Sequence, residues 1–358
     1  MTRALQLGAV WRVLRQTNLD AIKREAEQAF RLLIVGTDVA EAERVARLLS
    51  AADGGEVHGW LSVRQPPLNT AQLRDLGQVD AAIILGPSAN LPEPLHASRK
   101  VLTAARIPVL TIITDLPANQ QTGTVGQRGG SARVTVVSLD ADAVAKRVAP
   151  ALLGIVPPGL RLALGRQLPP LRPALFEQLI EETARANASY SFSTGIAEII
   201  PVLDIPLNVG DLIILTKNQL IMGYKIALAA GKEGEPRQLI GEIVGVLGGG
   251  FLFRQVARQL VGLIPVAGIV PKVAVAYAGT LAIGRAVVLW ATEGQNVSPE
   301  TLRQFYGEAL ERGRRVAEAL VTSAKRVRRP RLPTSGGSRE ASEERPGLWQ
   351  RVWRRLPF

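Results

Sequence analysis

The chain has 358 residues, of which 47% are hydrophobic and only 4% aromatic, so its cores must be packed mainly with Ala, Val, Leu and Ile. This length is enough for two domains of ordinary size. No cysteine and only two histidines, His58 and His96, are present, which excludes disulfides, thiolate metal sites and histidine-rich metal sites. The formal net charge of +12 is concentrated near the C-terminus.

Residues 1–30 are predicted to form an N-terminal amphipathic helix from Leu5 to Phe30, either continuous or broken near Asn18. This helix either docks on the following domain or lies on a membrane surface. Because Met1–Phe30 has no uninterrupted apolar core, no signal peptide is expected. The bulk of the protein is therefore expected to stay in the cytoplasm.

Residues 31–154 alternate between short apolar runs and helical patterns, which is typical of a parallel sheet covered on both faces. The expected strands are Arg31–Val35, Val57–Val63, Ala81–Leu85, Val109–Ile113 and Val134–Val137. The expected helices are Asp38–Leu49, Leu95–Ala105 and Ala141–Leu153. Gly123–Ser131 precedes a strand rather than a helix, so we interpret its glycines as a flexible loop and not as a phosphate cradle.

Gly36 follows the first strand, where a P-loop nucleotidase would begin its G-x-x-x-x-G-K-[ST] motif. The motif is lost here, because Glu41, Ala42 and Glu43 occupy the positions of the second Gly, the Lys and the Ser/Thr. Two carboxylates would stand where phosphates need cations. No cofactor is expected.

Two further positions agree with this loss. Thr114–Pro117 replaces the guanine-reading Asn-Lys-x-Asp of a GTPase, and Ser138 alone matches a base-contacting loop. No G-x-G-x-x-G follows Val35, so a Rossmann site is not predicted either. The domain is predicted to be GTPase-shaped and to lack nucleotide chemistry.

Five prolines in residues 155–173 prevent a long helix and mark a domain boundary. Residues 174–324 form the second predicted domain, all-α and apolar, beginning with a helix over Ala174–Tyr190. A helix from about Leu207 to Ala230 is expected to end at Gly231. Its polar island, Thr216–Gln219, is either an interior cluster that binds a ligand or lines a path, or the solvent face of the helix; we favour the solvent face.

The apolar domain either packs as a soluble bundle or enters a membrane. Small residues recur every four positions at Ala274, Ala278, Ala282 and Ala286, a spacing that lets helix backbones approach closely in either setting. A spanning helix needs about 20 apolar residues, and charges such as Lys272 and Arg285 interrupt every long run. A hairpin turning at Pro265–Gly268, or shallow insertion, is therefore favoured over simple spans. A last helix begins at Ser298.

Residues 325–358 form a basic tail with ten basic and three acidic residues. Its polar linker is expected to be disordered. Its end is either an interfacial membrane helix or a peptide that docks back on the protein. Nucleic acid is disfavoured as a partner, because no nucleic-acid-binding fold accompanies the charge. The candidate lipid-contact residues are Lys325, Arg326, Arg328, Arg329, Arg331, Trp349, Trp353, Arg354 and Arg355.

From Leu162 to about Leu320 the sequence resembles the bacterial family catalogued as domain of unknown function number 697. The resemblance lies in runs such as ANASYSFSTGIAEIIPVLDIPLNVGDLIILTKNQLIMGYKIA and FRQVARQLVGLIPVAGIVPKVAVAYAGTLAIGRAVV. It implies a helical domain that commonly follows a GTPase-like domain and is often predicted to be membrane-associated. The family has no established activity, and no catalytic residue carries over.

Together these patterns predict a non-catalytic, membrane-associated protein on the cytoplasmic side of an anionic lipid surface. It would serve as a scaffold or as the partner of an active GTPase relative. The alternatives are an atypical GTP-binding protein or hydrolase, and a soluble, cytoplasmic helical interaction protein. The sequence contains no indication of oligomeric state.

Overall fold

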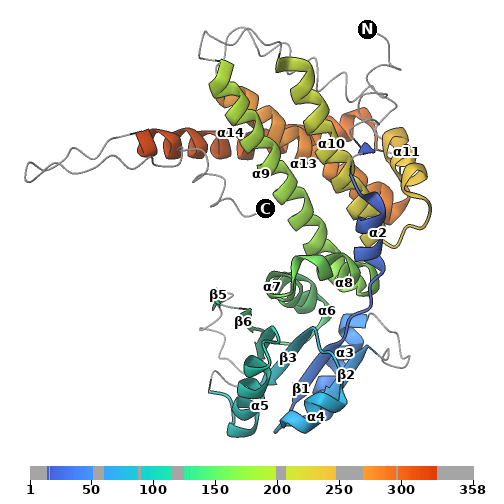
Figure 1. The fold of residues 1–358 in the computed structure, drawn as a ribbon, viewed down its shortest axis with the longest axis vertical. Coiled ribbons are helices and arrows are strands. Elements are labelled where there is room, and N and C mark those ends of the chain that lie inside the picture. Colours follow the sequence, from blue (N-terminus) through green and yellow to red (C-terminus); the bar gives the residue numbers. More distant parts are fainter. Residues whose placement is uncertain are drawn as a thin grey trace, which may run out of the picture. The chain divides into compact units, whose positions relative to one another are not determined.

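The structure is a computed structural model that describes residues 14–15, 17–50, 60–87, 90–114, 125–128, 130–198, 207–246, 269–295 and 297–328. The chain divides into two units, Met1–Leu320 and Val321–Phe358. The first holds a mostly parallel sheet with its covering helices, followed by a group of apolar helices (Figure 1). The predicted combination of α/β and all-α architecture is confirmed.

The sheet contains the five parallel strands that the sequence predicts, in the order β2-β1-β3-β4-β6, with an antiparallel strand β5 at one edge. β1, β3 and β4 are buried along their whole length, as expected for strands covered on both faces. The strands are β1 (Leu32–Gly36), β2 (Leu61–Arg64), β3 (Ala81–Gly86), β4 (Val109–Ile113), β5 (Val125–Arg128) and β6 (Ser131–Thr135).

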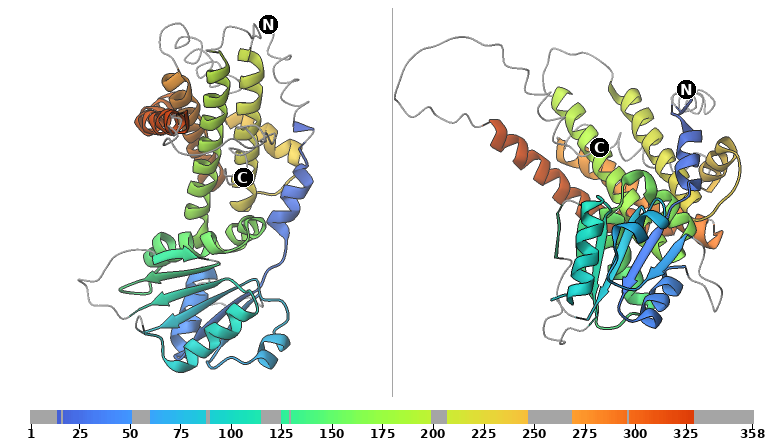
Figure 2. Two further views of the ribbon diagram at one scale, coloured as in Figure 1. Left: turned by 60° about the vertical axis from the view of Figure 1, so that its left-hand side comes forward. Right: turned by 60° about the horizontal axis from the view of Figure 1, so that its bottom comes forward.

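Helices cover both faces of this sheet (Figure 2). Alternate residues of each strand point to opposite faces, so Leu33 of β1 packs in the core beneath α4 and α5 while Ile34 packs in the core beneath α3 and α7. The helices are α3 (Val39–Ser50), α4 (Thr70–Asp75), α5 (Glu93–Ala104), α6 (Ala141–Ala143) and α7 (Ala149–Ile155), with a π-helical turn, η2 (Val144–Val148), between the last two. The short helix α4 was not predicted; a capping box between Asn69 and Gln72 marks its start.

The prediction of a simple loop over Gly123–Ser131 is wrong. Part of it forms β5, which pairs with β6 through the registers Val125↔Arg133 and Arg128↔Ser131. Gly130 has φ of +79° in the intervening turn, a conformation that glycine adopts without strain. The hairpin pairs the outer edge of β6, which a loop would leave open.

Between α7 and residue 171 the chain forms only short helices, η3 (Pro158–Leu160), α8 (Arg161–Gln167) and η4 (Pro169–Leu171), as the prolines predict, whereas residues 172 and 173 already belong to a long helix. The segment is nevertheless packed, because Leu164, Leu168 and Leu171 are all buried in a core shared by the sheet and the following helices. Packed turns of this kind hold their neighbours more firmly than an extended linker would.

Three helices make up most of the apolar domain: α9 (Arg172–Glu198), α10 (Leu207–Ala229) and α13 (Ile269–Glu293). α9 and α13 lie side by side and antiparallel, because Gly195 contacts Ile269 near one end and Gly284 contacts Ile180 near the other (Figure 1). A Cβ atom added at Gly284 would lie 2.5 Å from the Ile180 side chain. Small residues therefore lie at the contact between these two helices, but they are glycines meeting isoleucine side chains and not the predicted alanine stripe.

The remaining helices of the domain are α11 (Pro236–Val246) and α14 (Pro299–Arg328). α10 ends as predicted, since Gly231 has φ of +92° and the two amides after Ala230 donate back to Leu228 and Ala227 carbonyls at 3.0 Å each, the Schellman pattern. α9 is longer than the predicted Ala174–Tyr190, and Ser191 and Gly195 in its added part are buried.

The N-terminal helix is broken at Asn18, one of the two predicted alternatives. The Asn18 side chain accepts a hydrogen bond from Ala21 N at 2.9 Å and so caps α2 (Leu19–Glu27). Residues 1–13 lie outside the part that the structure describes. α2 packs against α8 of the segment between the domains and against α10 of the helical domain, whereas the prediction placed it on the α/β domain. The lysine Lys23 reaches the same region, donating to Gly234 O at 3.4 Å.

Candidate functional site

The carboxyl edge of the sheet, between β1 and β3, is where ligands bind in open α/β sheets of this strand order. In this chain β1 and α3 are joined only by Thr37 and Asp38. The Asp38 carboxylate accepts hydrogen bonds from the amides of Ala40 at 2.8 Å and Glu41 at 3.3 Å. These amides belong to the helix N-terminus that would hold a phosphate in a nucleotide-binding protein.

The four residues compared with P-loop positions lie in β1 and α3. Gly36 ends β1 and lies over Ala42, which is fully buried, so that a Cβ atom added at Gly36 would be 3.3 Å from the Ala42 Cβ. Glu41 is in the first turn of α3, and Glu43 pairs with Arg47 at 3.6 Å on its exposed side. The Asp38 carboxylate thus occupies the place where a P-loop would bind a phosphate. None of the four residues Gly36, Glu41, Ala42 and Glu43 is positively charged.

Asp38 is expected to stabilise α3 as an N-cap. Replacing Asp38 with Ala removes the acceptor for two amides, so the free energy of unfolding should fall by about 1 kcal/mol. Asp38→Asn is the matched control. Because Asn caps helices nearly as well as Asp, this variant should change the free energy of unfolding by only a few tenths of the loss expected for Asp38→Ala. Urea unfolding of the two variants checks the expectation; equal losses would mean that charge rather than capping is responsible.

Ser138, the residue that matches a base-contacting loop, is also used locally. Its hydroxyl donates to the Asp140 carboxylate at 2.5 Å, and this carboxylate caps α6 through Ala143 N at 2.8 Å. The hydrogen bond from Ser138, followed by that from Ala143, lowers the pKa of Asp140. Residues 115–117 of the other GTPase position lie outside the described part of the chain.

A buried polar cluster joins α9, α10 and α13 in the middle of the apolar domain. At its centre is Thr280, whose hydroxyl donates to Ala276 O at 2.8 Å and accepts from Asn187 Nδ2 at 2.9 Å and Gln219 Nε2 at 3.2 Å. Asn218 Nδ2 extends the chain of hydrogen bonds to Asn187 Oδ1 at 2.8 Å. Asn187 and Thr280 are completely buried.

This cluster shows that the interpretation of Thr216–Gln219 as a solvent face is wrong for Thr216 and Gln219, while Lys217 and Asn218 are half-buried. Thr216 and Gln219 are each only 6% exposed, because α9 and α13 cover this side of α10. The sequence of α10 alone does not reveal its partners, which lie 31 and 61 residues away. The cluster consists only of amides and hydroxyls, so it offers hydrogen bonds and helix register, not acid–base or metal chemistry.

A titratable pair lies beside this cluster. The Tyr277 hydroxyl on α13 donates to Glu181 Oε2 on α9 at 2.6 Å, and Arg185 Nε donates to the other oxygen, Oε1, at 2.5 Å. Burial, followed by the hydrogen bond to Glu181, raises the pKa of Tyr277 to about 12. The neutral phenol is therefore the form that the fold favours.

Stability should consequently depend on alkaline pH. Because the folded-state pKa of Tyr277 is about 12 and its ordinary value 10.0, its contribution is complete below pH 10 and is lost as the pH rises toward 12. The Tyr277→Phe variant lacks this titration, so its stability should fall less steeply in that window. Urea midpoints on both sides of pH 10 measure the difference; parallel slopes in the two proteins would refute the assignment.

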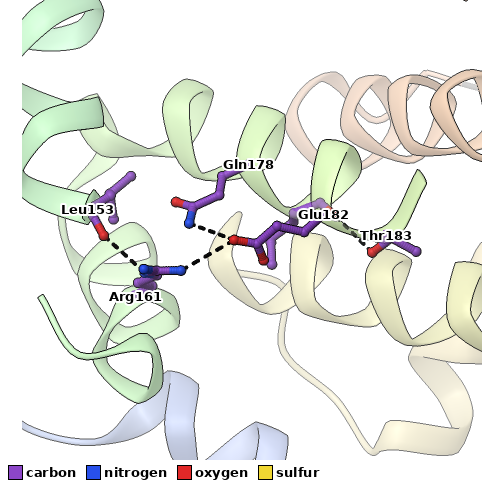
Figure 3. Close-up of polar contacts among 6 residues, drawn as sticks. Leu153, Arg161, Gln178, Glu182 and Thr183 are labelled. Carbon is purple, nitrogen blue, oxygen red and sulfur yellow. Dashed lines mark hydrogen bonds and ion pairs between the residues drawn. The ribbon is translucent and has the colours of Figure 1, made fainter. Parts of the chain in front are cut away.

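Arginines of residues 155–173 bind the carbonyl ends of helices. Figure 3 shows Arg161, whose Nε donates to Leu153 O near the end of α7 at 2.9 Å and whose Nη1 pairs with Glu182 of α9 at 3.4 Å. Gln178 holds the same Glu182 oxygen at 2.8 Å. Cations at helix C-termini are favoured by the unpaired carbonyls and the helix dipole.

Two more arginines repeat this arrangement. Arg166 Nη1 caps the end of α10 by donating to Leu228 O at 2.9 Å and to Lys232 O at 3.1 Å. Arg172 donates to Gly165 O at 3.1 Å and to Arg166 O at 3.0 Å, two carbonyls in the last turn of α8. Burial and then the charge of Arg166 lower the pKa of Arg172. These contacts connect residues 155–173 to α7, α9 and α10. The prolines of the segment did not indicate this role.

The predicted lipid-contact residues of the tail mostly lie outside the described residues. Lys325, Arg326 and Arg328 belong to the backbone of the last turns of α14, but their side chains are not described. Arg329, Arg331, Trp349, Trp353, Arg354 and Arg355 are outside entirely. Their role in lipid contact stays a prediction.

One helix in the described part of the chain, α13, is long and apolar enough to cross a membrane, with a mean hydropathy of 1.6 in its best 18-residue window. That window is 83% buried against the protein itself, as in the core helix of a soluble bundle. Among the described residues there is no group of three or more His, Asp or Glu side chains that would hold a metal ion. No protein-family model and no curated protein matches this sequence.

Proposed function

We propose that this chain is a non-catalytic protein that associates with the cytoplasmic side of a membrane. Its α/β domain, shaped like that of a GTPase, would serve as a scaffold or pair with an active GTPase relative. Its apolar helices and basic tail would provide the attachment to anionic lipid. The proposal rests on the apolar helices and the basic tail, and on the missing nucleotide-binding motif of the α/β domain.

The observation that carries the non-catalytic part is the Asp38 carboxylate on the N-terminal amides of α3. A bound phosphate would have to displace this carboxylate and then lie near Glu41, without the lysine that neutralises phosphates in P-loops. The two-residue connection between β1 and α3 is also too short to wrap around a phosphate chain. Nucleotide binding of the GTPase type is therefore unfavourable at this edge.

The membrane part is supported by α13, the apolar helix of the domain, and by the net charge of +7 that Lys325–Phe358 carry. Each basic residue near an anionic membrane surface contributes about 1 kcal/mol of attraction. A soluble interaction protein is the second candidate, and the 83% burial of the α13 window favours it. An atypical GTP-binding protein is the third.

Fractionation of lysed cells distinguishes the first two candidates. We expect the full chain to sediment with membranes and to be partly released by high salt, since salt screens the attraction of the tail to anionic lipid. Chain lacking Lys325–Phe358 should stay on the membrane if the apolar helices contribute. Full-length protein found wholly in the supernatant would instead favour the soluble interaction protein.

Nucleotide binding is tested separately by equilibrium titration of the purified protein with GTP or ATP and magnesium. We expect no saturable binding in the micromolar range. Micromolar affinity would overturn the non-catalytic part of the proposal and favour the atypical GTP-binding protein, whatever the fractionation shows.

A further inference from the structure

The turn between α10 and α11, residues 231–235, is held by side chains from two other elements. Arg166 of α8 donates to two carbonyls at the end of α10. Lys23 of α2 donates to Gly234 O at 3.4 Å. Two elements from outside the helical domain thus hold the end of one of its helices. We call α2, residues 158–171 and this turn together the joint.

On its other side, α2 is fixed to the sheet. Residues 28–31 lead directly from α2 into β1. Phe30 in this connection is buried and packs on the Trp60 ring, with the two ring centroids 5.0 Å apart. Trp60 O in turn accepts a hydrogen bond from Leu32 N, the first residue of β1, at 2.9 Å. The first strand of the sheet is therefore connected through α2 to the end of α10.

The segment 158–171 makes the second connection between the two domains. Gln28, just after α2, donates to Gly159 O, and Gln167 donates to Gln28 O at 3.4 Å, so the segment and α2 also hold each other. Arg161 joins the end of α7 in the α/β domain to α9 in the helical domain (Figure 3). The joint therefore consists of two chain segments, distant in sequence, that brace one another.

A single apolar core runs through the joint. Leu164 and Leu168 of the joint belong to the same cluster of buried side chains as Ile34 of the sheet and as Ile180 and Val287 of the helical domain. The described members of the core beneath α4 and α5, by contrast, all come from the α/β domain. Domains of one chain move independently by default, unless the interface between them is large and hydrophobic. The shared core provides an interface of that hydrophobic kind.

We infer that the α/β domain and the helical domain are one cooperative unit, coupled through the joint, so that neither opens without the other. The domain boundary predicted at residues 155–173 is then not a boundary between folding units. A partner that binds only the α/β domain consequently stabilises the helical domain as well, because it raises the free energy of the one opening that both domains share. This coupling is independent of membrane association and goes beyond the proposed function.

Two conservative core substitutions test the coupling on the full chain. Ile84→Val removes one methylene from β3 in the core beneath α4 and α5, and Ile283→Val removes one from a buried side chain of α13. Each should make the shared opening about two- to tenfold more frequent. Hydrogen exchange under native conditions, followed by mass spectrometry, measures the slowest amides of β4 for the α/β domain and of α10 for the helical domain.

We expect either substitution to speed exchange in β4 and in α10 by the same factor, although each changes only one domain. Val137→Thr, at a 61% exposed position of the α/β domain, is the control and should change neither. If Ile84→Val speeds only β4 and Ile283→Val speeds only α10, the domains open separately and the inference is overturned. An effect on the other domain in one direction alone would overturn it too, because a coupling free energy is reciprocal.

Discussion

Replacing Thr280 with Val is expected to lower the free energy of unfolding by about 2–4 kcal/mol. Valine fills the same volume but accepts no hydrogen bond, so Asn187 Nδ2 and Gln219 Nε2 lose their shared acceptor inside the apolar domain. A buried donor left without a partner costs about 1–3 kcal/mol. Urea unfolding followed by far-ultraviolet circular dichroism, which reports the helices, measures the loss.

Thr292 provides the matched control on the same helix. Its hydroxyl makes the same type of bond to the carbonyl four residues earlier, Val288 O at 2.8 Å, but it is exposed and accepts no bond from another helix. Thr292→Val should therefore change stability by about 0.5 kcal/mol or less. If the two variants lose the same amount, the interhelical hydrogen bonds of Thr280 contribute nothing beyond its own helix.

Gly313→Ala should destabilise the protein although alanine is the better helix former. A Cβ atom at this position of α14 would lie 2.5 Å from Ala274 O and 3.0 Å from Ala274 Cα. These are backbone atoms of α13, which no side-chain rotation moves away, so the two helices have to separate. Overpacking of this kind costs about 1–3 kcal/mol, more than the roughly 1 kcal/mol gained in helix propensity.

Gly307 lies on the same helix with no atom within 4 Å of an added Cβ. Gly307→Ala should therefore stabilise the protein by about 0.5–1 kcal/mol, because only helix propensity changes. Opposite signs for the two substitutions, measured by the same urea unfolding, would establish the close contact of α14 with α13. Stabilisation by both would show that α14 does not pack against Ala274 in solution.

Thr280 and Gly313 show two ways in which the apolar domain is held together. Thr280 supplies polar contacts between helices and Gly313 allows close backbone approach, and both devices work in water and in lipid. The membrane question is thus separate from the question of what stabilises the domain.

Sequence patterns located the five parallel strands of the α/β half but missed α4 and β5. Short apolar runs such as those of β1 and β4, alternating with helical patterns, favour buried strands, and a parallel sheet of them requires covering helices on both faces. The absence of a P-loop motif could be read from the sequence because that motif is local: each position of it would lie within eight residues of Gly36. The glycine at position 231 also correctly predicted where α10 ends.

Contacts between distant segments were not available to such reasoning. Hydrophobic periodicity places Gln219 on the surface of its helix, because its amide is polar. Residue type alone does not say whether that amide bonds to water or to Thr280. Asp38 was visible in the sequence, but its capping of α3 depends on the short turn that brings its side chain back to the amides. The arginines of residues 155–173 were hidden for the same reason, since their acceptors are backbone carbonyls, which every residue possesses.

The sequence by itself determined the elements of this protein: a parallel sheet without nucleotide motifs, apolar helices rich in small residues, and a basic tail. These follow from local propensity and hydrophobic pattern, which act over a few residues. Only the tertiary structure decided that the polar residues of α10 face inward and that α13 is enclosed by its neighbours. The reason is physical, because burial and hydrogen-bond satisfaction belong to pairs of surfaces, and a single segment holds only one member of each pair.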